Sequence, residues 1–360
     1  MLTHLGNAWG DLGDYHKQKD LLTRSLAITK KHYGKDHIVT GQTLCNLADA
    51  WGELGDYHKQ IDLLIRSLEI TEKHYAKDDI EISDILTDLG NAWGDLGDYH
   101  KQKDLLIRSP EITEKHYGKD HLETAHVLTD LANAWGNLGD YHKQKDLLKR
   151  ALKIEETHYG KNDPETSITY VHLSIAWGNL GYYEEKKRLL TKALKIHKKY
   201  YGEDHPDIGN TLSHLGNALY NLNDLENAQQ LLLRALQINK DFFGEKHPLL
   251  CPILTDLGNC FLALENHSQA ENYLLSALTL NESFYGKNHL SARLTLTSLG
   301  DLYYQMKEFE KALDYQSRAY QISEVNLGES HKHTIEAINE IIKITEHIPP
   351  TEVRSENKFA

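Results

Sequence analysis

The chain repeats itself with a fixed period of 42 residues. One segment, Leu-Gly-Asn-Ala-Trp-Gly-Asp-Leu-Gly-Asp-Tyr, occurs twice unchanged. Its other copies differ from it more toward the C-terminus. The copies start at Leu5, Leu47, Leu89, Leu131, Leu173, Leu215, Leu257 and Leu299. A period of about 20 to 50 residues is typical of repeat architectures, in which stacked units share one continuous core. We therefore expect a repeat protein rather than a set of separate globular domains.

Each period predicts two helices joined by a short turn. In the second period, Leu44, Leu47, Ala48 and Trp51 follow the i, i+3, i+4, i+7 spacing of an amphipathic helix, and Gly55 then interrupts the pattern. A second apolar stripe follows and ends in most periods with an aromatic residue and a glycine, which closes a helix without steric cost. No stretch shows the alternation of a β-strand.

The next helix is expected to begin with proline in three periods. Pro164, Pro206 and Pro248 stand at that point, where the fixed φ and missing N–H of proline suit the first helical position. Pro110 is different, because the other periods carry leucine in its slot, inside the second helix. Proline there predicts a kink and a loss of about 3 kcal/mol.

These patterns predict eight helix hairpins and a final capping helix in one array, 1–347. The approximate hairpin boundaries are 1–36, 37–78, 79–120, 121–162, 163–204, 205–246, 247–288 and 289–330. The capping helix is expected at 331–347, and a disordered tail at 348–360. The first helix lacks the opening turn of the later ones. Either the start falls there by chance or the chain is a piece of a longer array, and both interpretations stay open.

The residues of these periods resemble those of tetratricopeptide repeat (TPR) proteins. Leu296, Leu299-Gly300 and Tyr303 match the signature of the first helix, and Ala228 and Ala235 match the small residues of the second. The 42-residue period is similar to that of kinesin light chains and nephrocystin-3. The resemblance covers nearly the whole chain and implies an all-α fold, a right-handed α-solenoid. The first four periods depart from the family pattern where it prefers alanine, and carry Gln18, Gln60, Gln102 and Gln144.

In this family the first helices line a concave groove, so the resemblance implies where a ligand would bind. The corresponding slots hold Asn7, Asp49, Asn91, Asn133, Ile175, Asn217, Asn259 and Asp301. Asparagine both donates and accepts hydrogen bonds, so a column of asparagines can pair with an extended peptide backbone. Alternatively, these asparagines only solvate the groove, or they recur because the periods were copied. No lysine or arginine occupies these slots, which disfavours a clamp for carboxylates.

A second column changes character along the chain. Its first five members are glycines, Gly10, Gly52, Gly94, Gly136 and Gly178. Either the backbone of a ligand approaches them closely, or duplication preserved them despite a cost of roughly 0.5–1 kcal/mol each. Later periods carry Tyr220, Leu262 and Tyr304 in this slot, so we expect the C-terminal half to hold an anchored side chain.

No enzyme activity, cofactor or metal site is expected. The glycine-rich word lies inside a helix, follows no strand and lacks the Gly-Lys-Ser/Thr ending of a phosphate loop. The histidines are mostly copies of two positions, without a second metal ligand at i, i+4, and predict capping or surface roles. The tryptophan series is expected in the core, and consists of Trp9, Trp51, Trp93, Trp135 and Trp177.

Charge and cysteine content narrow the class of partner. The net charge of -13 argues against nucleic acids and anionic membranes, which need a basic surface. The three cysteines form no disulfide framework and point to a reducing compartment, the cytoplasm. No secretory signal and no membrane-spanning run is visible. We therefore expect a monomeric scaffold that binds an extended segment of a partner protein. The alternative is a regulatory or self-assembly module of a longer repeat protein.

Overall fold

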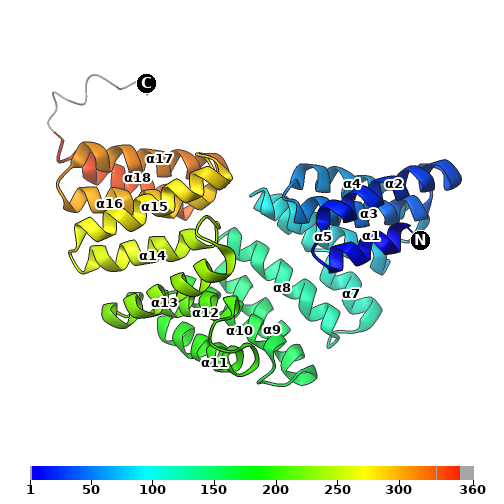
Figure 1. Ribbon diagram of the computed structural model, residues 1–360, viewed down its shortest axis with the longest axis horizontal. Helices are drawn as coiled ribbons and strands as arrows, with labels where there is room; N and C mark the ends of the chain where they lie inside the picture. Colours follow the sequence, from blue (N-terminus) through cyan, green and yellow to red (C-terminus); the bar gives the residue numbers. More distant parts are fainter. Residues whose placement is uncertain (1, 330, 349–360) are drawn as a thin grey trace. The chain divides into compact units, whose positions relative to one another are not determined.

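The computed structural model describes residues 2–329 and 331–348, which form α-helices, one short 3-10 helix and their connections, and contain no β-strand (Figure 1). The predicted tail at 348–360 falls, beyond Ile348, outside these residues. The chain divides into two compact units, Met1–Gly160 (unit 1) and Lys161–Ala360 (unit 2). Each unit is a row of helix hairpins, as the 42-residue period predicts.

Unit 1 contains four hairpins. Its helices are α1 (Leu2–Asp11), α2 (Tyr15–Tyr33), α3 (Ile38–Glu53), α4 (Tyr57–His74), α5 (Ile80–Asp95), α6 (Tyr99–Leu106), α7 (Ser109–Tyr117), α8 (Leu122–Asn137) and α9 (Tyr141–His158). The first helices of its hairpins are α1, α3, α5 and α8. The pair α6 and α7 takes the place of one second helix.

Unit 2 contains four hairpins and a final helix. Its helices are α10 (Pro164–Asn179), α11 (Tyr183–Tyr201), α12 (Pro206–Asn221), α13 (Leu225–Phe243), α14 (Leu250–Ala263), α15 (His267–Tyr285), η1 (Leu290–Ala292), α16 (Arg293–Gln305), α17 (Phe309–Leu327) and α18 (Lys332–Thr345). The first helices are α10, α12, α14 and α16. In unit 2 the first helices of successive hairpins touch one another and form a continuous row, and in unit 1 α1 touches α3 and α5 touches α8.

Histidine and aspartate cap the first helices, which confirms the capping role predicted for one set of histidines. Nδ1 of His37 accepts from the backbone N–H of Val39 at 3.2 Å, and Asp79 caps α5 in the same way. The aromatic residue that ends the preceding helix stacks on the capping histidine. Ring centres lie 5.0 Å apart for Tyr33 and His37 and 4.4 Å apart for Tyr201 and His205. The connectors capped by histidine also contain a glycine with positive φ, such as Gly34 at 93°.

Two of the three predicted helix starts at proline are confirmed. Pro164 begins α10 and Pro206 begins α12. The prediction for Pro248 is wrong, because α14 begins two residues later, at Leu250, and Pro248 lies in a turn. His247 still accepts a hydrogen bond from the backbone of Leu249, but α14 starts later, at Leu250, and has no side-chain cap of its own.

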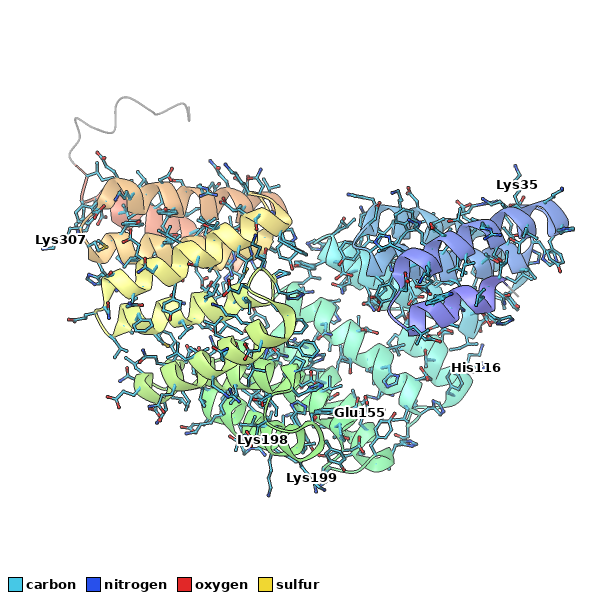
Figure 2. The ribbon with its side chains drawn as sticks, viewed as in Figure 1. Lys35, His116, Glu155, Lys198, Lys199 and Lys307 are labelled. Atoms are coloured by element: carbon cyan, nitrogen blue, oxygen red, sulfur yellow. The ribbon has the colours of Figure 1, made fainter. Side chains whose placement is uncertain are left out.

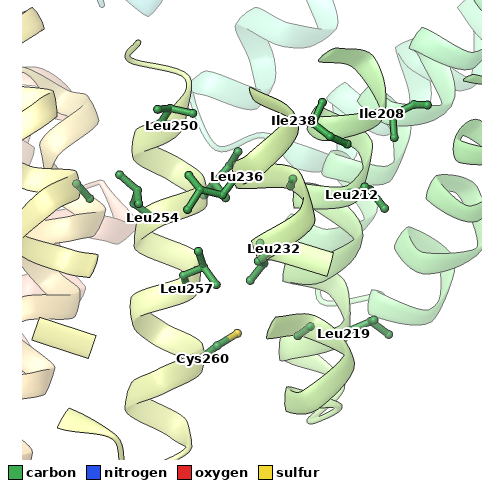
Figure 3. Packing of buried hydrophobic residues seen from close by; sticks show 14 residues of the cluster. Ile208, Leu212, Leu219, Leu232, Leu236, Ile238, Leu250, Leu254, Leu257 and Cys260 are labelled. Carbon is green, nitrogen blue, oxygen red and sulfur yellow. The ribbon is translucent and has the colours of Figure 1, made fainter. Parts of the chain in front are cut away.

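The slot that holds a small residue in all eight hairpins marks the closest approach of the two helices. A Cβ atom added to Gly90 would lie 2.8 Å from Cγ of Leu106, and one added to Gly258 would lie 2.5 Å from Cγ of Leu274. Around these helix crossings, leucine side chains form the hydrophobic core. In unit 2, Leu232, Leu236 and Leu257 pack between α12, α13 and α14, in the cluster that Figure 3 shows.

Pro110 interrupts its helix, as predicted. The preceding piece, α6, ends at Leu106, four residues before the proline. Proline supplies no N–H to that carbonyl group, and its ring crowds the residue at i−4. Hydroxyl groups of α5 form hydrogen bonds to α7, the helix that follows the break. Ser83 Oγ lies 3.1 Å from Thr113 Oγ1, and Thr87 Oγ1 lies 3.3 Å from Ser109 Oγ.

The final helix α18 is close to the predicted capping helix and covers one face of the last hairpin. Ile344 is buried in the core cluster of α14 to α17, and Ala337 is also buried. The opposite side of α18 is exposed and apolar, with Ile335, Ile338 and Ile342 on it, Ile342 at 53%. Ile342 occupies the slot that is glycine at Gly300, and no second helix of the described residues packs on it.

Candidate binding surface on the first helices

The predicted groove residues lie on the first helices, and all of them except the exposed Asp49 are half-buried. They are Asn7 on α1, Asp49 on α3, Asn91 on α5, Asn133 on α8, Asn217 and Tyr220 on α12, Asn259 on α14, and Asp301 and Tyr304 on α16. Half-burial leaves each side chain accessible on one side and held in place on the other. They form one row within unit 1 and another within unit 2.

Some of the asparagines bind a carboxylate on the next first helix. Nδ2 of Asn217 donates to Oδ1 of Asp256 at 3.0 Å, and Asn91 donates to Asp130, which has the same position in its repeat. The asparagine column therefore does more than solvate a groove. In two hairpins it ties neighbouring first helices together, a role that the sequence alone did not suggest.

In unit 1 the corresponding positions on neighbouring first helices hold carboxylates that lie close together. Asp49 stands where five other hairpins have asparagine, and its charge acts on Asp88 of the next first helix. Burial and then the charges of Asp49, Asp84 and Asp130 raise the pKa of Asp88 to about 7. Burial and the charge of Glu53 raise the pKa of Asp49 to about 6. Among the described residues no lysine or arginine forms an ion pair with Asp49 or Asp88, so this surface is acidic and uncompensated.

In unit 2 a lysine reaches the corresponding surface, although the sequence predicts no lysine or arginine in the groove slots. Lys186 belongs to a second helix, α11, but its side chain passes between first helices, and Nζ donates to Oδ1 of Asn217 at 2.6 Å. Other lysines of α11 reach solvent, as Figure 2 shows for Lys198 and Lys199 at the end of the helix, whereas Lys186 is only 7% exposed. The signal was present in the sequence, because Lys186 stands where earlier periods have glutamine.

The glycine column makes room for these long side chains. A Cβ atom on Gly94 would lie 2.5 Å from Nε2 of Gln102, and one on Gly178 would lie 2.6 Å from Cδ of Lys186. Later hairpins reverse the sizes, with Tyr220 on the first helix and Ala228 on the second. Neither of the two explanations given for these glycines from the sequence is needed, because the second helix itself fills the space.

The tryptophans are half-buried, so the prediction that they belong to the core is only partly right. Trp51 packs against a core cluster on one side, and Nζ of Lys59 lies 3.9 Å from its ring centre on the other. The same ammonium forms an ion pair with Asp56, the cap of α4, at 2.6 Å. Equivalent lysines cover Trp9, Trp93 and Trp135.

The two predicted tyrosines have different surroundings. Tyr220 is half-buried beside Asp256 and Cys260, and burial raises its pKa. Tyr304 packs against Phe309 and His347, with Nζ of Lys343 4.7 Å from its ring centre. A pocket of about 360 Å³ lies next to Phe309 and His347. Tyr220 thus joins the polar row of α12 and α14, whereas Tyr304 packs at the end of unit 2.

The described residues contain no cluster of three histidine, cysteine or acidic side chains that could hold a metal ion. Within the same residues, no helix combines the length and apolar character needed to cross a membrane.

The fold and the repeated hairpin define the chain as an α-solenoid repeat protein. Models of the tetratricopeptide repeat match residues 1–38, 40–81, 83–123 and 124–165, and a second form matches 179–241, 207–283 and 253–324. The chain therefore belongs to the tetratricopeptide repeat family. A search of curated proteins finds no match.

Solved structures of low sequence identity share the fold. NprR in complex with its cognate peptide NprX is 14% identical, with a TM-score of 0.65, over 96% of this chain and 95% of that one. BtubC (BKLC) from P. vanneervenii is 20% identical, with a TM-score of 0.51, over 64% and 92%. TPR-like repeats of kinesin-light-chain type from Podospora anserina are 20% identical, with a TM-score of 0.50, over 57% and 97%. The predicted likeness to kinesin-light-chain repeats is confirmed for the fold, and function has to be argued from the surface.

Proposed function

We propose that this protein is a non-catalytic cytoplasmic scaffold that binds an extended segment of a partner protein along its first helices. The observation that carries the proposal is the acidic row of unit 1, with Asp49, Asp88 and Asp130 on three successive first helices. Like charges held together cost stability, and burial adds to that cost, as the raised pKa values of Asp49 and Asp88 indicate. A bound segment with basic groups or hydrogen-bond donors would reduce both the repulsion between the carboxylates and the cost of burying them.

The asparagines support the same interpretation. Asn7 has a buried Oδ1 without a hydrogen-bond partner among the described residues, and Asn133 and Asn259 are half-buried on the same rows. An extended backbone offers N–H and C=O groups to such side chains. NprR, which shares the fold, is known in complex with a peptide, and this likeness supports a peptide ligand without identifying it.

The test is a selection from a random peptide display library on the intact chain, followed by calorimetric titration of the selected peptides. Basic or neutral peptides should bind, and Asp49→Asn with Asp88→Asn should weaken them more than tenfold, since about 1.4 kcal/mol corresponds to a factor of ten. Asp62→Asn, on the exposed side of α4, is the matched control. Full affinity in the double variant would move the site away from the first helices.

The alternative function is self-assembly. It is favoured by one observation, the exposed apolar stripe of Ile335, Ile338 and Ile342 on α18. Light scattering over a range of concentrations separates the two proposals. A constant monomer mass argues for the scaffold, whereas a mass that rises with concentration and falls to the monomer in Ile342→Lys would argue for assembly through α18.

A further inference from the structure

Several second helices carry a cationic side chain that binds a carboxylate of the preceding hairpin. Such ion pairs are Arg66–Asp36 and Arg150–Glu114 in unit 1, and Arg234–Asp204 and Arg318–Glu282 in unit 2. The cations occupy one slot of the 42-residue period, which holds Arg24, Arg66, Arg108, Arg150, Lys192, Arg234, Ser276 and Arg318. Ser276, on α15, is therefore the one member of this slot without a positive charge.

The carboxylates at these junctions come from two positions of the preceding hairpin. They lie 30 residues before the cation in Asp36 and Asp204, and 36 residues before it in Glu114 and Glu282. Counted back from Ser276, the same two positions hold Lys246 and Lys240. The junction between α13 and α15 has thus lost its cation and has lysine at both places from which a carboxylate would bind it.

A pocket of about 300 Å³ lies between α13, α14 and α15 at this junction. Leu250 and Leu254 of α14, which Figure 3 labels, form its buried apolar side, and Lys240 and Ser276 also line it. The hydroxyl group of Ser276 donates to the carbonyl group of Asn272, in its own helix, at 2.7 Å. Ser276 therefore makes no bridge to the preceding hairpin, and the space beside it stays open.

The lysines of this junction carry more charge than the carboxylates beside them can match. Neither Lys240 nor Lys246 forms an ion pair with any residue that the structure describes. Glu245 lines the pocket and can match one of them, but the other then lacks a carboxylate. Asp241, the next acidic residue of α13, accepts a hydrogen bond from Gln237 at 2.7 Å. In the preceding junction both cations are paired, Lys198 with Glu203 and Arg234 with Asp204.

We propose that the junction between α13 and α15 binds a glutamate side chain from an acidic segment of a partner protein. The carboxylate supplies the negative charge that this junction lacks, beside Lys240 and Lys246, and the methylene groups lie on Leu250 and Leu254. A single carboxylate suits the site better than a nucleic acid does, because the junction offers two lysines in a chain of net charge -13. The site lies on second helices, so it is separate from the proposed surface on the first helices.

The test is a selection of display-library peptides that bind the intact chain but not the double variant Lys240→Glu with Ser276→Arg. This variant copies the junction of Glu282 and Arg318, so it supplies the missing pair from within the chain. The selected peptides should share a glutamate at one position. In calorimetric titration, replacing that glutamate by glutamine should weaken binding about tenfold, and Lys240→Gln should weaken it at least about threefold.

Control variants separate this site from general charge effects and from misfolding. Lys307→Gln removes the same charge from the turn before α17, where Figure 2 labels the lysine, and should leave affinity unchanged. The double variant should melt at or above the wild-type temperature. If it melts lower, Lys240→Gln decides the question alone. Equal losses in Lys240→Gln and Lys307→Gln would overturn the proposal.

Two further outcomes distinguish this proposal from its alternatives. An empty selection, selected peptides without a shared acidic residue, or their displacement by a DNA oligonucleotide would each overturn it. Asp49→Asn with Asp88→Asn should leave the affinity of these peptides unchanged, and a loss there would contradict a separate site. If that variant also leaves all other library peptides unaffected, the proposed function fails and this site stands.

Discussion

Asn217 donates to Asp256 at 3.0 Å, and three periods earlier Asn91 makes the same contact with Asp130. The bond joins the first helices of successive hairpins. An asparagine that serves a ligand can therefore also serve the fold, and the two roles can be separated by mutation.

Asn217→Ala should lower stability by about 1–3 kcal/mol, because it removes the bond to Asp256 and leaves the buried ammonium of Lys186 without its acceptor. The pKa of the Asp256 carboxyl, already raised to about 6 by burial, should rise further, because Asn217 opposes that rise. Thermal melting and NMR titration of the carboxyl measure the two effects. Asn259→Ala, in the same column on α14, serves as the control, and equal losses in both variants would show that the bond contributes nothing. Without the structure, neither column asparagine would be expected to affect melting.

Two glycine columns should respond differently to alanine. Gly258→Ala places a Cβ atom 2.5 Å from Cγ of Leu274, a fully buried side chain, and should cost about 1–3 kcal/mol. Gly94→Ala meets only the amide end of Gln102, which can move, and alanine gains roughly 0.5–1 kcal/mol of helix stability. The second variant should stay within about 1 kcal/mol of wild type. Chemical denaturation measures both, and similar losses would show that Gln102 is as rigid as Leu274.

Pro110→Leu should raise the melting temperature by restoring the hydrogen bond and relieving the ring contact that end α6 at Leu106, an effect of up to about 3 kcal/mol. The converse change, Leu152→Pro, alters the same slot in the intact helix α9 and should destabilise by a similar amount. Scanning calorimetry of the two variants gives the comparison. A Pro110→Leu chain that melts at or below the wild-type temperature would mean that the hydroxyl contacts of Ser83 and Thr87 depend on the break.

Stability should depend on pH through the acidic row of unit 1. Folding raises the pKa of Asp88 from 3.8 to about 7 and that of Asp49 to about 6. A raised pKa means that the folded state holds the proton more tightly, so this contribution is complete below the unfolded value and is lost as pH rises through 6 to 7. The ionised carboxylates then repel one another.

Asp88→Asn should therefore stabilise the protein at about pH 8 by about 1 kcal/mol after solvent screening, or about 2–4 °C, and much less at about pH 5. Melting at both pH values with wild type and variant measures the difference, and the histidines of unit 2 cancel because both chains contain them. Asp62→Asn is the control. A gain that is independent of pH would assign the effect to helix propensity rather than to charge.

Much of the fold follows from the sequence because copying imposes one pattern many times. Periodicity located the hairpins, the capping histidines and the small residues at Gly90 and Gly258, since each depends on local geometry or on one crossing. The late start of α14 after Pro248 was missed, because proline suits a turn as well as a first helical position. The predicted groove residues were placed on the first helices, and whether they bind a ligand stays a prediction.

The positions of Lys186 and Asp88 on this surface could not be predicted from the sequence, for a physical reason. The predicted groove slots lie on first helices alone, whereas the ammonium of Lys186 comes from a second helix through the space at Gly178. Asp88 lies in a different slot from Asp49, and their proximity depends on the stagger between neighbouring hairpins. Such relationships need three-dimensional register, which a period of fixed length does not give.

The connector between α4 and α5 lacks the positive-φ glycine that the other connectors between hairpins share, since Tyr75 is extended, Ala76 follows it and Asp79 is the cap. It leads directly into the hairpin that Pro110 breaks. One weak point thus precedes this hairpin, and a second lies within it. Under a stretching force applied to the ends of unit 1, rupture should start there, and backbone amides of α6 and α7 should exchange their hydrogens before those of α9.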